Sequence, residues 1–141
     1  MLPDTLHKLP QAERFAYAKI LAYMSRIDNE LTIEEMAMFE QRLGTALLSP
    51  SQRKEVRGSL KSPPPLAESL ACLSAEGGRL AFRDAVLMCA ADGTVDDDEM
   101  EALKELSKLL DLGDDSVSRM LAWVRDGYNW MQAGFELLNE L

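Results

Sequence analysis

The sequence contains a single histidine, His7, and it lacks the residue combinations that most enzymes use. Without a second histidine, the usual Ser–His or Cys–His activation of a nucleophile is unavailable. The pair Gly77-Gly78 is not followed by the Lys and Ser or Thr of a phosphate-binding loop. We therefore predict no catalytic residues, and we expect that the protein is not an enzyme.

The two cysteines, Cys72 and Cys89, lack the short paired spacing of metal-binding or redox motifs. Each lies in an apolar stretch with helical character, and free cysteine packs much like a small apolar residue. We expect both to be buried structural thiols.

Long apolar runs are also absent: the longest, residues 85–91, has seven residues, whereas a membrane span needs about 20. The N-terminus carries Asp4 and Lys8, without the basic start and apolar core of a secretory signal. We expect a cytoplasmic protein with no transmembrane segment.

Positive charge is scarce, with 15 Lys and Arg against 24 Asp and Glu, which gives a net charge of −9. The basic residues are dispersed, and nucleic-acid binding requires them to be clustered. We expect no nucleic-acid partner. Acidity of this size favours basic partners or divalent cations.

Helical periodicity covers nearly the whole chain, and no alternating strand pattern of useful length occurs. The sequence therefore predicts an all-α fold, a compact bundle of about seven to eight helices in one domain, 1–141. Helix start and stop signals place the expected helices at about residues 11–27, 32–47, 49–59, 66–75, 79–91, 96–110, 114–127 and 128–141.

The sequence also predicts which residues of the second helix are buried, where glycines end helices, and where the C-terminal aromatic residues lie. The second helix should bury Met36, Phe39, Leu43 and Leu47, which lie on one helical face. Gly77-Gly78 should close the helix over 66–75, and Gly127 should interrupt the chain before the last helix. The aromatic cluster near the C-terminus either closes the core or forms an exposed patch; its members are Trp123, Tyr128, Trp130, Met131 and Phe135.

An internal repeat relates residues 21–36 to residues 85–100, with four identities in sixteen positions. In both copies an apolar helix ends at an acidic turn, which leads into a capped helix. We interpret this as two stacked helical hairpins, repeat one over about 11–60 and repeat two over about 79–127, followed by the C-terminal helix 128–141. The identical pairs are Met24 and Met88, Asp28 and Asp92, Glu35 and Glu99, and Met36 and Met100.

The acidic turns have two interpretations. Carboxylates in the first turn of a helix cap its free N–H groups and complement its dipole. Alternatively, they bind a hard cation, because Ca²⁺ and Mg²⁺ prefer carboxylate oxygens; we expect either before Zn²⁺. From Asp92 to Glu99 the chain matches only the rear half of an EF-hand loop, since Met88 and Ala90 occupy the front ligand positions. A cation would therefore need ligands from both turns, and the candidates are Asp28, Glu35, Asp92, Asp96 and Glu99.

The segment around the second turn resembles the signature of the tellurite-resistance TerB-like domains, and the resemblance extends over about residues 15–125. The residues that carry it are Ala90-Ala91-Asp92-Gly93-Thr94-Val95-Asp96, Glu99 and Leu103-Lys104-Glu105-Leu106.

The resemblance implies a compact, internally duplicated helical domain in a bacterial, cytoplasmic, stress-associated protein. It also implies divalent-cation binding at an acidic surface and protein partners near the inner membrane. Asn29 and Thr32 depart from the second copy, which has Gly93 and Asp96 at those positions.

The sequence therefore supports two functional hypotheses. In the first, the protein binds a divalent cation at the acidic turns. In the second, it is a protein–protein interaction module whose acidic face or C-terminal helix docks another protein, and the acidic residues are only helix caps. The sequence also leaves a homodimer open.

Overall fold

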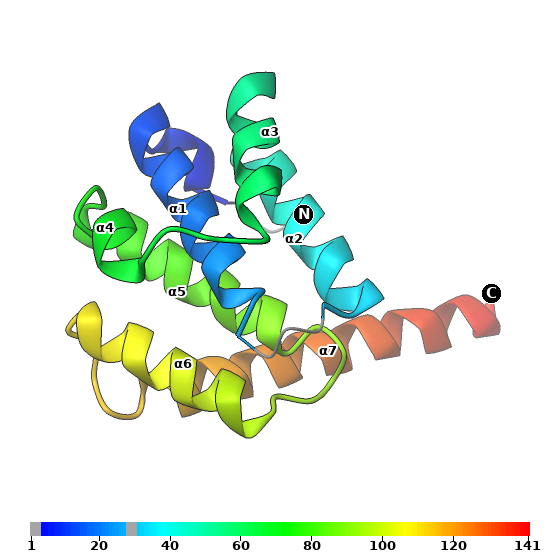
Figure 1. The fold of residues 1–141 in the computed structure, drawn as a ribbon. Helices are drawn as coiled ribbons and strands as arrows, with labels where there is room; N and C mark the ends of the chain where they lie inside the picture. The colour runs from blue at the N-terminus through cyan, green and yellow to red at the C-terminus, as the bar shows by residue number, and fades with distance from the viewer. Residues whose placement is uncertain (1–3, 28–30) are drawn as a thin grey trace.

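The computed structural model describes residues 4–27 and 31–141, and this part of the chain contains helices and no strand (Figure 1). The prediction of an all-α bundle of about seven to eight helices is confirmed. A short 3₁₀ helix, η1 (Leu6–Lys8), precedes the α-helices, which are α1 (Gln11–Met24), α2 (Ile33–Thr45), α3 (Pro50–Ser59), α4 (Leu66–Leu70), α5 (Ala75–Cys89), α6 (Asp97–Leu109) and α7 (Ser116–Glu140).

Helices α1 and α5 pack together at the centre of the bundle (Figure 1). Helix α1 also contacts α2, α3 and α4, and α5 contacts α2, α6 and α7. Helix α5 is buried along most of its length because small residues such as Ala81 and Ala85, both 0% exposed, let its neighbours approach closely. The apolar run after residue 84 thus forms the central helix that the sequence predicts.

Side-chain caps start four of these helices, α2, α3, α5 and α6. Thr32, Ser49 and Asp96 each accept a hydrogen bond from the backbone N–H three residues later, as their sequence context predicts. Ser49 and Asp96 complete full capping boxes with Gln52 and Glu99.

Helix α5 begins earlier than predicted, and the prediction that Gly77-Gly78 closes the preceding helix is wrong. Helix α4 already ends at Leu70, and Ser74 caps α5 by accepting a hydrogen bond from the Gly77 amide. Both glycines are buried in the first turns of α5. A Cβ on Gly78 would lie 2.6 Å from a methyl carbon of Leu110, so this glycine permits close packing against the end of α6.

Two residues expected in the buried face of α2 are exposed instead: Met36 by 37% and Leu47 by 62%. The buried residues of α2 are Glu35, Phe39 and Leu43, which follow each other at intervals of four and so share one face. Leu47 lies beyond the end of the helix in a left-handed conformation, with φ of 52°.

Two helix boundaries also differ from the prediction. Helix α1 ends at Met24, and residues 25–27 form a turn. Gly127 does not interrupt α7, which continues through it as one helix, because a single glycine costs an α-helix only about 1 kcal/mol. Asp115 precedes α7 but forms no side-chain cap.

Of the two cysteines, Cys89 is buried as expected, whereas Cys72 is exposed, so the prediction of two buried thiols is wrong for Cys72. Cys72 follows the short helix α4 at the molecular surface, where its thiol contacts the Glu68 carbonyl. None of the described helices is both long and apolar enough to cross a membrane.

Candidate functional site

The second acidic turn connects α5 to α6 and is held by hydrogen bonds within the turn. Gly93 adopts φ of +92°, a conformation that L side chains rarely adopt. One oxygen of Asp92 accepts hydrogen bonds from the Thr94 backbone N–H at 3.0 Å and from the Thr94 hydroxyl at 3.2 Å. The exposed Asp92 side chain therefore shapes the turn.

The capping box at the start of α6 employs two further candidate ligands. Asp96 accepts a hydrogen bond from the Glu99 backbone N–H at 2.8 Å, and Glu99 accepts one from the Asp96 backbone N–H at 3.3 Å. Both carboxylates thus satisfy helix N–H groups that would otherwise lack a partner inside the helix.

Glu35 and Glu99 occupy matching positions in the two predicted repeats, and the charge of Glu35 acts on Glu99. Both side chains are buried, with 4% and 6% exposure. Burial raises the pKa of Glu99 to about 7, against the opposing hydrogen bond from the Asp96 amide, and the negative charges of Asp96 and Glu35 add to the rise. Two carboxyl groups from turns that are distant in sequence therefore lie within electrostatic range of each other.

The five candidate ligands are thus only partly assembled. Glu35 and Asp96 each lie within electrostatic range of Glu99, the Asp92 side chain bonds to Thr94 of its own turn, and Asp28 lies outside the described residues. Across residues 4–27 and 31–141, no group of three or more His, Cys, Asp or Glu side chains is arranged to hold a metal ion.

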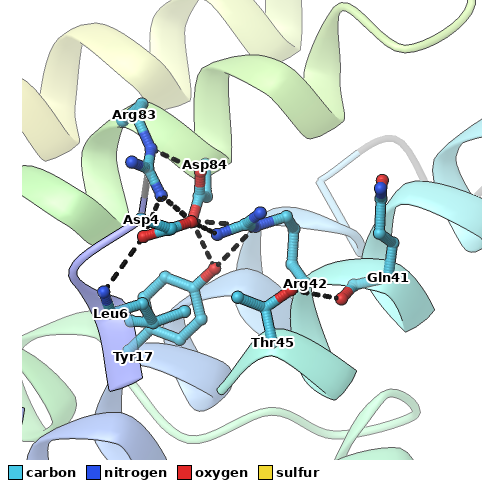
Figure 2. A network of polar contacts seen from close by, with 8 residues as sticks. All are labelled: Asp4, Leu6, Tyr17, Gln41, Arg42, Thr45, Arg83 and Asp84. Atoms are coloured by element: carbon cyan, nitrogen blue, oxygen red, sulfur yellow. Dashed lines mark hydrogen bonds and ion pairs between the residues drawn. The ribbon is translucent and has the colours of Figure 1, made fainter. Parts of the chain in front are cut away.

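A second polar cluster, which sequence analysis did not identify, lies inside the bundle (Figure 2). Its centre is Asp84 of α5, which is 0% exposed. Asp84 accepts hydrogen bonds from the Tyr17 hydroxyl, from Arg42 Nε at 3.1 Å and from Arg83 Nε at 2.7 Å. Asp4 joins both arginines from the N-terminal segment, at 2.6 Å from Arg42 and 3.2 Å from Arg83.

This buried cluster is electrically balanced, because two arginines face two aspartates. Burial alone would raise the pKa of Asp4, but hydrogen bonds from Arg42 and the Leu6 amide, with the charges of Arg83 and Arg42, lower it to about 2. Burial and the negative charge of Asp84 raise the pKa of Tyr17 well above its usual value. Every member is paired, so the cluster ties α1, α2, α5 and the N-terminal segment together.

One local signal in the sequence was available for this cluster. Asp84 directly precedes the apolar run 85–91, and it lies four residues before Met88 on the buried side of the helix. A charged residue on the buried apolar face of a helix needs a polar partner inside the protein, because charged side chains are almost never fully buried unless they are paired. Arg83 is adjacent in sequence, but Arg42 and Tyr17 are 42 and 67 residues away along the chain, so no local pattern identifies these two partners.

The third feature is the outer part of α7, residues 125–141, in which every residue is exposed. Helix α7 contacts α5 and α6 through its first turns only, where Val117, Met120, Leu121 and Val124 join the core. Beyond them the helix extends past the rest of the molecule (Figure 1, orange to red). Its exposed large apolar side chains are Trp123, Tyr128, Trp130, Met131, Phe135, Leu137, Leu138 and Leu141.

Of the two interpretations of the aromatic cluster, the exposed patch is therefore correct. Tyr128, Trp130 and Phe135 are exposed by 67%, 70% and 58%. At the inner end of this patch lies a groove of about 510 Å³ between the α5–α6 turn and α7. Its lining includes Ala90, Gly93 and Val95 from the turn and Leu121, Val124 and Tyr128 from α7.

Comparisons of the chain with models of known families, with curated proteins and with solved structures give no match. The resemblance to TerB-like domains therefore stays a prediction from the residues of the second turn.

Proposed function

We propose that this protein is a non-enzymatic interaction module of the TerB-like type, which binds an amphipathic helix through the exposed apolar side of α7. The observation that carries the proposal is that every residue of 125–141 is exposed, including several large apolar side chains. Contiguous exposed apolar patches of this kind mark protein or membrane interaction sites.

The instability of an isolated helix supports this proposal. An isolated helix has little stability of its own in water, and most helices in proteins are stabilised by packing of an apolar face. In the part of the chain that the structure describes, no residue of 125–141 is buried. A partner that covers the apolar side would supply the missing stabilisation.

In this proposal the acidic turns act as helix caps. Asp96 and Glu99 form a complete capping box, and Asp92 stabilises the turn through Thr94. Their contribution is to orient α5 against α6, and hence to form the platform from which α7 extends. A cytoplasmic, stress-associated role remains part of the proposal through the TerB-like resemblance alone.

The experiment that tests the proposal is site-specific photo-crosslinking in cells that express the full chain. A photoreactive residue in place of Met131 should give covalent protein adducts, which mass spectrometry then identifies. The matched control replaces Asn129, which is polar and lies on the opposite side of the helix. Equal labelling from both positions, or no protein adduct from position 131, would overturn the proposal.

A second candidate function is divalent-cation binding at the buried pair Glu35 and Glu99. The proximity of these two carboxyl groups favours it: burial is the main cause of the raised pKa of Glu99, the negative charge of Glu35 adds to the rise, and a cation between the two groups would offset both effects. Oxygen ligands of this type suit Ca²⁺ or Mg²⁺.

Calorimetric titration of chelator-treated protein with Ca²⁺ and Mg²⁺ tests this second candidate. Saturable binding should be stronger at pH 8 than at pH 6, because protons compete for Glu99, and E35Q/E99Q should abolish it. Binding that E35Q/E99Q leaves intact would place the cation elsewhere, and the absence of heat and of stabilisation at millimolar cation would contradict this candidate.

A further inference from the structure

We infer that the occupant of the exposed side of α7 is a second copy of this chain, with the two α7 helices packed antiparallel about a twofold axis. This inference rests on the proposed function, since it names the partner of the same surface. Four features of α7 lead to it: the spacing of its apolar residues, two glycines, the distribution of charge, and the exposed area.

The apolar residues of α7 follow a heptad spacing, with alternating steps of four and three residues along one stripe. The first members of the stripe pack on α5 and α6, and the later members extend it into solvent without a change of spacing. A stripe of this kind is suited to pack against another helix. Its members are Val117, Leu121, Val124, Tyr128, Met131, Phe135 and Leu138.

An antiparallel pair of these helices is self-complementary. When Tyr128 lies opposite Met131 of the second copy, Val124 lies opposite Phe135 and Leu121 opposite Leu138. This register places the outer end of each helix over the groove beside the α5–α6 turn of the other copy, which Val95, Leu121 and Val124 line. The same patch is used by both copies, as twofold symmetry requires.

Gly127 and Gly134 lie one heptad apart and flank this stripe. Glycine is a poorer helix former than alanine, and none of the described residues requires its small size here, because a Cβ at either position would have no described atom within 4 Å. In the antiparallel register Gly127 of one copy lies beside Gly134 of the other. The two backbones can therefore approach closely along this edge.

The distribution of charge permits the contact between two acidic molecules. Each chain carries a net charge of −9, yet residues 127–135 contain no charged side chain. Two copies can thus meet along this segment without like charges facing each other. A membrane surface fits less well, because residues 126–141 contain no Lys or Arg to attract anionic lipids.

The exposed apolar area of the stripe is a substantial part of what a dimer buries. Because an aromatic side chain presents about 150–250 Å², Tyr128 and Phe135 at their observed exposures contribute on the order of 250 Å². Met131 and Leu138 of the same stripe, exposed by 52% and 64%, add to this area. A standard interface buries about 800 Å² on each partner.

The test is analytical ultracentrifugation of the full chain from micromolar to submillimolar concentration, with M131E/F135E as the disrupting variant. Both side chains are more than half exposed, so the monomer should fold normally. We expect the wild-type chain to reach twice its mass of 15.7 kDa. M131E/F135E should raise the dissociation constant by roughly tenfold or more, because it buries charge, whereas the control N129E should leave it unchanged.

Two further variants distinguish this geometry from nonspecific association. G127L/G134L should weaken the dimer while helix content, measured by circular dichroism, is kept or increased, whereas sticky aggregation would become stronger. In a C72S background, a mixture of Y128C and M131C chains should form disulfides faster than either chain alone, because these positions lie opposite each other.

A monomer at all concentrations, or a dimer that M131E/F135E leaves intact, would overturn the inference. A chain that stays monomeric and binds vesicles of phosphatidylcholine and phosphatidylglycerol through α7 would also overturn the inference. A monomer whose position 131 still crosslinks to a different protein in cells would overturn the second copy as partner and keep the proposed function. The absence of any adduct from position 131 would overturn both the inferred dimer and the proposed function.

Discussion

At the scale of single residues, Glu99 combines two roles that oppose each other. Its side chain caps α6, yet its burial next to Asp96 and Glu35 makes the negative charge unfavourable and raises its pKa to about 7. In the unfolded chain a glutamate titrates near pH 4.3. The folded protein therefore binds the Glu99 proton more tightly than the unfolded chain does.

This difference predicts a pH dependence of stability. Because the folded-state pKa is the higher one, the stabilising contribution of protonated Glu99 is full below about pH 4.3 and is lost as the pH rises through 7. The variant E99Q, which does not titrate, should gain about 1–2 kcal/mol relative to wild type between pH 5 and pH 8. Urea unfolding at both pH values measures this; parallel pH profiles of the two proteins would contradict it.

Asp84 is the residue on which the buried cluster depends, and its removal should be among the most damaging single changes. Asp84→Ala leaves Arg42, Arg83 and the Tyr17 hydroxyl without their shared acceptor, and loss of one partner from a buried ion pair costs about 3–5 kcal/mol.

Two other variants should destabilise the protein less than Asp84→Ala does. Tyr17→Phe removes one hydroxyl and should cost only about 1–2 kcal/mol. Glu40→Ala removes the surface pair with Arg57, at 2.7 Å, and should change the unfolding free energy by less than about 1 kcal/mol. Denaturant unfolding ranks the three variants, and an Asp84→Ala cost no larger than that of Glu40→Ala would show that the cluster contributes little.

At the scale of elements, the first turn of α5 shows how a glycine can serve packing between helices. Gly78 faces Leu110 at the end of α6, whereas Gly44 of α2 has open space at its Cβ position. Gly44→Ala should stabilise the protein by roughly 0.5 kcal/mol through helix propensity. Gly78→Ala should lose that gain and destabilise by about 1 kcal/mol, because Leu110 must move. Thermal unfolding of both variants gives the comparison, and equal stabilisation would refute it.

At the scale of the whole molecule, the unfolding free energy of the bundle should not depend on the outer part of α7. Deletion of residues 128–141 should change the unfolding free energy at low protein concentration by less than about 0.5 kcal/mol, because none of these residues is buried. Val117→Ala, a change at a buried position of the same helix, should cost about 1–3 kcal/mol.

The same deletion also separates folding from association. If two copies pair through α7, the melting temperature of the full chain rises with protein concentration, and that of the shortened chain does not. A concentration-dependent melting temperature in the shortened chain would locate the association elsewhere.

Local chemistry in the sequence determined the helical class and several helix starts. Thr32, Ser49 and Asp96 act as caps in the structure because a capping side chain bonds to a backbone N–H only three residues away. The exceptions, such as Gly77-Gly78 and Gly127, arise because a glycine ends a helix only when the packing around it requires that end.

Only the tertiary structure decided which polar and apolar residues meet. Glu35 lies near Glu99, and Asp84 meets Tyr17 and Arg42, through packing between helices that are distant along the chain. The stripe of α7 makes the same point, because Leu121 and Phe135 follow one spacing, yet only Leu121 packs on the core. Periodicity shows which side of a helix is apolar, but only the positions at which α5 and α6 end determine how much of that side is covered.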